Sequence, residues 1–139
     1  MTSYLLAVAA IWIAVALISG IGHIAVLGKT YKSMTGLLDE QTRKGFGAGK
    51  RRLPLYYIGS LAFALVFAYL LRMAWPADVP LANGALFGLM TGLVIYLPQM
   101  LTQFVPLCGI PYPAAMVIGG AIIGVLQTTV AGLIGGFIL

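Results

Sequence analysis

Four long apolar stretches make up most of the 139 residues, and they constrain the fold more than any motif does. A helix needs about 20 apolar residues, at about 1.5 Å each, to cross roughly 30 Å of hydrocarbon. Four segments have this length: Tyr4–Leu27, Pro54–Trp75, Leu81–Val105 and Pro113–Leu139. The sequence therefore predicts an all-α fold, an integral membrane four-helix bundle that forms a single domain over residues 1–139.

Composition argues against a soluble helical protein. Charged residues are 8% of the chain and hydrophobic residues 61%, whereas roughly a quarter of the residues in a soluble domain are charged. The four stretches are apolar around their whole circumference, while the core helices of a soluble protein keep a polar face. The first stretch is too long for the apolar region of a signal peptide, and no positive charge precedes it, so we expect it to remain as a mature helix.

Positive charge is concentrated in the loop 28–53, between the first and second helices. Seven of the eight Lys and Arg residues lie there: Lys29, Lys32, Arg43, Lys44, Lys50, Arg51 and Arg52. By the positive-inside rule we expect a cytoplasmic loop and external termini. Lys50, Arg51 and Arg52 would anchor the second helix, and Arg72 would reach the opposite interface. This placement explains the net charge of +5 without nucleic acid, because no aromatic stacking platform accompanies the basic residues.

The loop carries a helical pattern of its own. Tyr31, Met34 and Leu38 recur at i, i+3 and i+7, which predicts a short interfacial helix. The glycine-rich run 45–49 should end that helix as a hinge.

The start of the same loop resembles a known pattern. Gly28-Lys29-Thr30-Tyr31 followed by Met34-Thr35-Gly36-Leu37 is similar to the first loop of an uncharacterised family of small four-span bacterial membrane proteins, of the domain-of-unknown-function type. The resemblance implies four helices and a bacterial inner membrane. No activity comes with it.

Small and polar residues recur every four positions on each predicted helix. The third helix has Gly84, Gly88 and Gly92, and the fourth has Gly120, Gly124, Thr128, Gly132 and Gly136. The second has Tyr56, Ser60, Ala64, Ala68 and Arg72, and the first groups Trp12, Ala16, Ser19, Gly20 and His23. In lipid no hydrophobic force drives helices together, so close backbone approach and interhelical hydrogen bonds must do so. These small-residue seams predict tight packing and, where they exceed the needs of one bundle, association with copies or a larger membrane complex.

Several polar side chains fall inside the spans. The candidate polar site consists of His23, Tyr96, Gln99, Gln103 and Gln127. His23, Gln99 and Gln103 lie at a similar depth near the loop end, and Pro98 should kink the third helix where it lines a cavity. The other interpretation is that each glutamine makes an interhelical hydrogen bond worth about 1 kcal/mol.

His23 could be a proton relay, a metal ligand or an axial ligand of a tetrapyrrole, or it could bond a neighbouring backbone group. We expect no metal site within the chain, because no second His, Cys, Asp or Glu accompanies it in any span, and whether it binds a cofactor stays open. The lone Cys108 excludes an intrachain disulfide.

Motifs for catalysis are absent, so we expect no enzyme and no catalytic residue. All three acidic residues lie outside the spans, which argues against transport coupled to protons or sodium. Two functions fit the pattern. The first is an accessory or structural subunit that associates through glycine-rich helix faces. The alternative is a channel or carrier for a small neutral or apolar solute, whose path includes the candidate polar site.

Overall fold

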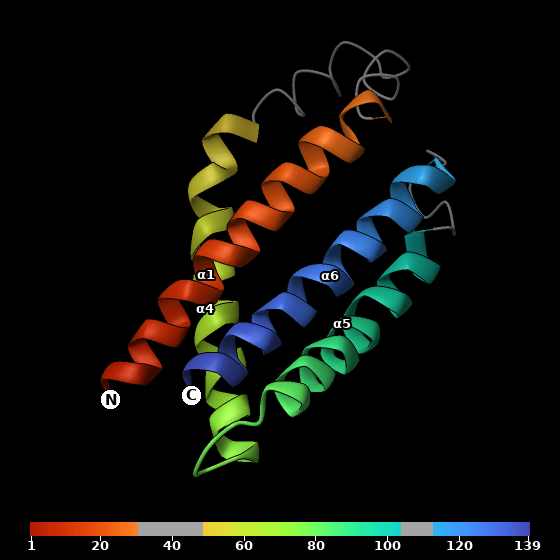
Figure 1. Cartoon of the computed structure of the whole chain (residues 1–139). Helices are drawn as coiled ribbons and strands as arrows, with labels where there is room; N and C mark the ends of the chain where they lie inside the picture. Colours follow the sequence, from red (N-terminus) through yellow and green to blue (C-terminus); the bar gives the residue numbers. More distant parts are fainter. Residues whose placement is uncertain (31–48, 104–112) are drawn as a thin grey trace.

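The computed structural model describes residues 1–30, 49–103 and 113–139, without the side chains of 49–53. The elements follow in the order α1 (Thr2–Ile21), the π-helical turn η1 (Gly22–Val26), α4 (Gly49–Ala74), α5 (Leu81–Gln103) and α6 (Ala114–Ile138), as Figure 1 shows. The described residues contain no strand. Four of these helical segments are long and apolar enough to cross a membrane. The predicted all-α class and the four apolar spans are confirmed.

Two boundaries differ from the prediction. The first span ends in a π-helical turn rather than continuing as α-helix. The second helix begins at Gly49 and contains Pro54, which we had expected at its start. A proline near a helix N-terminus removes only one backbone hydrogen bond, here the one that the Lys50 carbonyl would accept, and a long helix tolerates that loss. The backbone of the predicted anchor is therefore helical, whereas the predicted interfacial helix and most of the predicted hinge lie outside the described residues.

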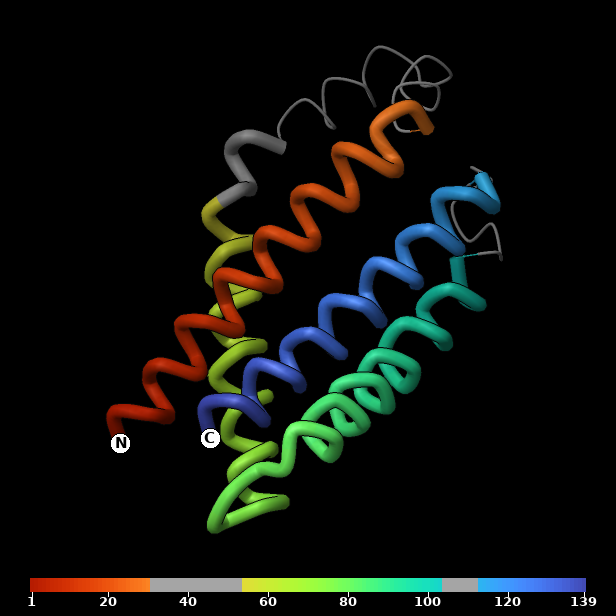
Figure 2. Tube along the Cα trace, in the orientation of Figure 1, coloured from red at the N-terminus to blue at the C-terminus, as the bar shows by residue number. Residues whose placement is uncertain are grey.

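Both termini lie at the same end of the molecule as the link between α4 and α5, opposite η1 and the start of α6 (Figures 1 and 2). α1 packs against α4 and α6, and α5 packs mainly against α6. Side chains of α1 also bind α4 directly. The Tyr4 hydroxyl donates to the Leu65 carbonyl at 2.9 Å, and the Trp12 indole N–H lies 3.0 Å from the Ser60 hydroxyl and 3.1 Å from the Tyr57 carbonyl.

The buried face of α1 is not the predicted seam. Its buried residues are Ala7, Val8, Ile11 and Val15, and a Cβ added at Gly20 would meet no atom within 4 Å. The predicted seam gave only part of this contact: Trp12 takes part in it, whereas Gly20 does not. Most of the α1 contact is made by other residues, which pack against alanines of α4 and α6.

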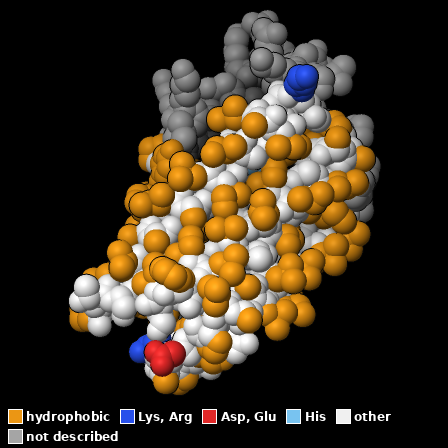
Figure 3. Space-filling model, viewed as in Figure 1, with side chains coloured by type: hydrophobic (Ala, Val, Ile, Leu, Met, Phe, Trp, Pro, Cys, Tyr) orange, Lys and Arg blue, Asp and Glu red, His pale blue; other side chains and the backbone are white. Residues whose placement is uncertain are grey.

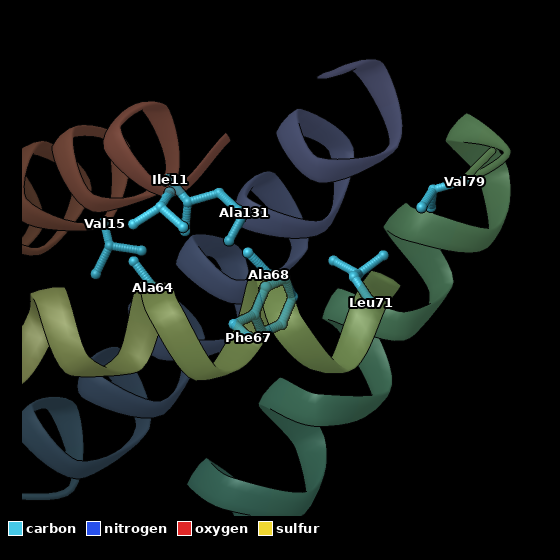
Figure 4. Close-up of a cluster of buried hydrophobic side chains, with 9 residues drawn as sticks. Ile11, Val15, Ala64, Phe67, Ala68, Leu71, Val79 and Ala131 are labelled. Atoms are coloured by element: carbon cyan, nitrogen blue, oxygen red, sulfur yellow. The ribbon is translucent and has the colours of Figure 1, made fainter. Parts of the chain in front are cut away.

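The core lies where α1, α4 and α6 meet (Figure 4). Ile11 and Leu71 are fully buried there, against Ala64, Ala68 and Ala131. Phe67 is also buried and meets Phe87 of α5 edge-on, with 5.3 Å between the ring centroids. Large side chains on one helix thus fill the space left by alanines on another, which gives dense packing without a polar atom.

α5 and α6 approach each other closely over the half of their length nearer the termini. The contact residues are the predicted small residues of both helices: Gly84, Gly88 and Gly92 on α5, and Thr128, Gly132 and Gly136 on α6. A Cβ added at Gly84 would overlap the main chain of Gly132, and one at Gly88 the main chain of Thr128. Main-chain atoms cannot rotate away, so this approach requires glycine. The two seams are packed against each other within one chain.

The described charged side chains lie at the two ends of the molecule, and hydrophobic side chains cover much of the flank between them (Figure 3). Lys29 follows the π-helical turn, and Arg72 is in the last turn of α4. The Arg72 guanidinium donates to the main-chain oxygens of Ala77 at 2.7 Å and Leu139 at 3.0 Å. This predicted anchor residue therefore connects the end of α4 to the end of α6.

Candidate functional site

A cavity of about 510 Å³ lies at the end of the helices opposite the two termini. Its walls come from all four long helices and from the π-helical turn. All five residues of the candidate polar site line it: His23, Tyr96, Gln99, Gln103 and Gln127. Residues far apart in the sequence are thus brought together around one space.

The floor of the cavity is a hydrogen bond between α5 and α6. The Gln127 amide nitrogen donates to the Tyr96 hydroxyl at 2.6 Å. The Tyr96 ring lies on Gly124, where an added Cβ would come within 2.6 Å of ring carbons. Immediately beyond, Gly92 meets Thr128 and the helices are in direct contact. The Tyr96–Gln127 pair therefore marks the depth at which the cavity ends.

His23 lies in the π-helical turn η1, which forms part of the cavity wall. Its Nδ1 lies 2.8 Å from the Ser19 carbonyl oxygen. Because a carbonyl only accepts, Nδ1 is the donor of this hydrogen bond. The turn is held on α6 at two points, since Gly22 lies against Ile123 and Leu27 against Gly119. π-Helical turns are frequent at functional sites, and here the turn places an imidazole beside the cavity.

Two amide side chains at the cavity wall have no hydrogen-bond partner among the described residues. Within the described part of the chain, neither the Gln99 nor the Gln103 amide makes a side-chain hydrogen bond, although the Gln99 main-chain oxygen accepts one from Thr102. No buried side-chain nitrogen or oxygen of the described residues lacks a partner, so both amides remain accessible. An amide in an apolar medium is costly unless it is hydrogen-bonded. These amides therefore favour water or a polar ligand in the cavity.

The described lining contains no Asp, Glu, Lys or Arg side chain. It combines the amides with the hydroxyls of Ser19, Tyr56 and Tyr96 and the imidazole of His23. Tyr96 accepts from Gln127 and so keeps its own hydroxyl proton for donation. The site thus offers several donors and acceptors without net charge, an arrangement that suits an uncharged polar molecule.

Gly120 differs from the other glycines predicted to pack. A Cβ added there would meet no atom within 4 Å, and the residue lines the cavity. It leaves space for the cavity and makes no close helix contact. Ser19 and Tyr56, which we had assigned to packing seams, also line the cavity. Ser19 lies one helical turn before His23, and Tyr56 lies one turn before Ser60. This spacing was the sequence signal that could have assigned them to the cavity.

A metal centre is not assembled in the described part of the chain, where no three His, Cys, Asp or Glu residues come together. The anchor residues lie elsewhere, with Arg72 at the opposite end and the side chains of Lys50, Arg51 and Arg52 outside the described set.

Comparison with known proteins adds nothing to this assignment: no family model, no curated protein and no solved structure matches the chain. The family resemblance of the first loop stays a prediction.

Proposed function

We propose that this chain binds a small uncharged molecule in the cavity, within the membrane, and acts as a carrier for it. The supporting observation is that seven hydrogen-bonding side chains gather around one cavity, whose described lining contains no Asp, Glu, Lys or Arg. If these side chains served only to hold the helices together, they would hydrogen-bond to each other, as Tyr96 and Gln127 do. Gln99 and Gln103 are not paired in this way within the described chain, so a solute that bonds to them replaces the water they would otherwise need.

The depth of the cavity supports binding inside the hydrocarbon layer. On α6 the lining extends from Met116 to Gln127, which is about 16 Å along a helix at about 1.5 Å per residue. Half of a hydrocarbon core is roughly 15 Å. The cavity floor is therefore near mid-membrane, where a hydrogen-bonding site must exclude lipid to function.

A carrier fits better than an open pore. Beyond Tyr96, glycine contacts close the space between α5 and α6, and the buried cluster around Ile11 and Leu71 fills the space between the other helices. The cavity is thus closed at the end that bears the termini. Release on that side requires the helices to move, which is the property that distinguishes a carrier from a channel.

The proposed setting is a bacterial inner membrane with the basic loop in the cytoplasm and both termini outside. The charge distribution of the loop 28–53 supports this orientation, and the family resemblance supports the compartment. The cavity then faces the cytoplasm.

The other predicted function, an accessory subunit that associates through its glycine faces, has weaker support. The seams of α5 and α6 are used against each other, and a Cβ at Gly84, Gly88 or Gly132 would meet the same chain. Association with copies or with a larger complex through other surfaces remains a proposal, which a blue native gel of the solubilised protein tests.

The proposed function is tested by whether water-soluble molecules reach the cavity. Gly120→Cys, in a Cys108→Ser background, places the single thiol in open space at the wall. In proteoliposomes we expect it to react with hydroxyethyl methanethiosulfonate, an uncharged hydrophilic reagent. Gly59→Cys is the matched control, because Gly59 also has no atom within 4 Å of an added Cβ but lies on the exposed flank of α4. Equal, slow labelling of both thiols would show that the cavity is closed to solute.

Transport is tested with Gly120→Leu, which fills the cavity, and with Gly59→Leu as its control. We expect uptake of a small uncharged solute such as glycerol or urea into proteoliposomes to be lost in the first variant only. Uptake that is insensitive to Gly120→Leu, or no faster than in protein-free liposomes, would count against a carrier for these solutes.

A further inference from the structure

A second hollow lies on the outer face of α5 and α6, beside the cavity. It has a volume of about 480 Å³ and an apolar lining, with Leu93 and Leu97 on α5 and Ile122 and Leu126 on α6. Among the described lining residues the single polar side chain is that of Thr129, which donates to the Val125 carbonyl at 2.8 Å. We call this hollow the outer groove. Its described lining offers no side-chain donor without an acceptor.

The cavity and the outer groove share two wall residues, Met100 of α5 and Ala121 of α6. The two spaces therefore adjoin between α5 and α6, just beyond the point where the Tyr96 ring lies between these helices. Ala121 has only a methyl group, and Met100 has a flexible, unbranched side chain that adapts to its surroundings. The partition between the polar and the apolar space is thus thin and deformable.

We infer that the ligand of this site is an amphiphile, with an uncharged hydroxyl- or carbonyl-bearing head in the cavity and an alkyl chain in the outer groove. This inference rests on the proposed function and names its substrate class. The chain would pass from the head between Met100 and Ala121 onto the lipid-facing side of the helix pair. A polar space and an apolar space that meet at one partition match the two parts of such a molecule.

The dimensions of the outer groove agree with one alkyl chain. Its lining on α5 extends from Leu89 to Met100, about 16 Å along the helix. This is close to the hydrocarbon depth of one leaflet, roughly 15 Å. An alkyl chain in the groove stays at its ordinary depth while the head occupies the adjoining cavity, so the molecule enters sideways from the bilayer.

The head group is uncharged because the described lining has no Asp, Glu, Lys or Arg side chain to pair with it. A charged head at this depth would lose its hydration without an opposite charge in return. Amides, hydroxyls and an imidazole instead match hydroxyl and carbonyl groups, which both donate or accept without charge.

The test uses protection of the Gly120→Cys thiol in the full chain, in nanodiscs and the Cys108→Ser background. We expect 1-decanoylglycerol to slow labelling by hydroxyethyl methanethiosulfonate about tenfold, at concentrations where glycerol has no effect. Ile122→Trp fills the outer groove and should abolish that protection without changing the labelling rate itself. Ile58→Trp, at a comparably exposed isoleucine outside both spaces, should leave protection intact. Decyl phosphate and decyltrimethylammonium should protect poorly.

The outcomes separate the two proposals. If the thiol is not labelled at all, the cavity is closed and the proposed function fails. If it is labelled but 1-decanoylglycerol gives no protection, or protects equally in Ile122→Trp, the amphiphile is refuted and the proposed function stands. Equal protection by the charged amphiphiles would overturn the uncharged head.

Discussion

Replacing Gly88 by alanine should destabilise the fold by forcing α5 and α6 apart. An added Cβ would overlap the carbonyl oxygen of Thr128 and lie 2.9 Å from the Thr128 carbonyl carbon and the Thr129 Cα. All three are main-chain atoms, so no side-chain rotation relieves the overlap. The helices must separate until these contacts return to ordinary van der Waals distances, and the neighbouring glycine contacts loosen with them.

The magnitude follows from a comparison with Gly120→Ala. Alanine favours a helix over glycine by up to about 1 kcal/mol, and this gain is common to the two variants because both positions are inside helices. Forcing a methyl group into a packed contact costs about 1–3 kcal/mol, and only Gly88→Ala carries this cost. The free energies of unfolding of the two variants should therefore differ by about 1–3 kcal/mol, where each 1.4 kcal/mol is about tenfold in the equilibrium constant.

Unfolding in mixed detergent micelles, followed by far-UV circular dichroism as sodium dodecyl sulfate is increased, measures this difference. Gly120→Ala should match or exceed the wild type, and Gly88→Ala should unfold at a lower dodecyl sulfate fraction. Equal midpoints for the two variants would refute the close α5–α6 contact. A Gly88→Ala variant more stable than Gly120→Ala would do the same.

Three further predictions concern other contacts. Trp12→Phe removes the indole donor to Ser60 and should lower the free energy of unfolding by about 0.5–1 kcal/mol. In a double-mutant cycle Ser60→Ala should cost less in the Trp12→Phe background than in the wild type, because only the Ser60 bond to the Tyr57 carbonyl is then lost. Leu71→Ala empties a fully buried position and should cost about 2–5 kcal/mol, whereas Leu70→Ala, 46% exposed, should change the same unfolding midpoint little. Arg72→Gln releases the end of α6, so hydrogen exchange of residues 134–139 should accelerate while that of α5 stays unchanged.

The spans were predictable because the bilayer imposes one requirement on each segment separately. Every backbone polar group in lipid must be satisfied within the helix, so length and hydropathy suffice to find it. The glycine contact between α5 and α6 was also predictable, because both helices carry small residues at the same spacing. The contact face of α1 could not be found in this way. Ile11 and Val15 pack there because Ala64, Ala68 and Ala131 on other helices make room for them.

The residues of the candidate polar site were predicted from their depth along the helices and from their polar side chains. The hydrogen bond between two of them was not predicted. Tyr96 and Gln127 are 31 positions apart, and their contact depends on the register between α5 and α6. The π-helical turn has no signal in the run 22–26, which has the composition of continuing α-helix. It is held by the contacts of Gly22 and Leu27 with α6, and such tertiary contacts are invisible in a local sequence pattern.

The cavity and the tight helix contact have a common origin in one series of residues. Gly84, Gly88, Gly92 and Tyr96 occupy successive positions four apart on the same face of α5, and each meets α6. The first three have no side chain, so the helices touch. The fourth has a ring, which lies on Gly124 and lines the cavity. Gln99 and Gln103, which follow Tyr96 on α5, line the cavity as well. The change from glycine to tyrosine therefore marks the point along α5 where direct helix contact gives way to the cavity.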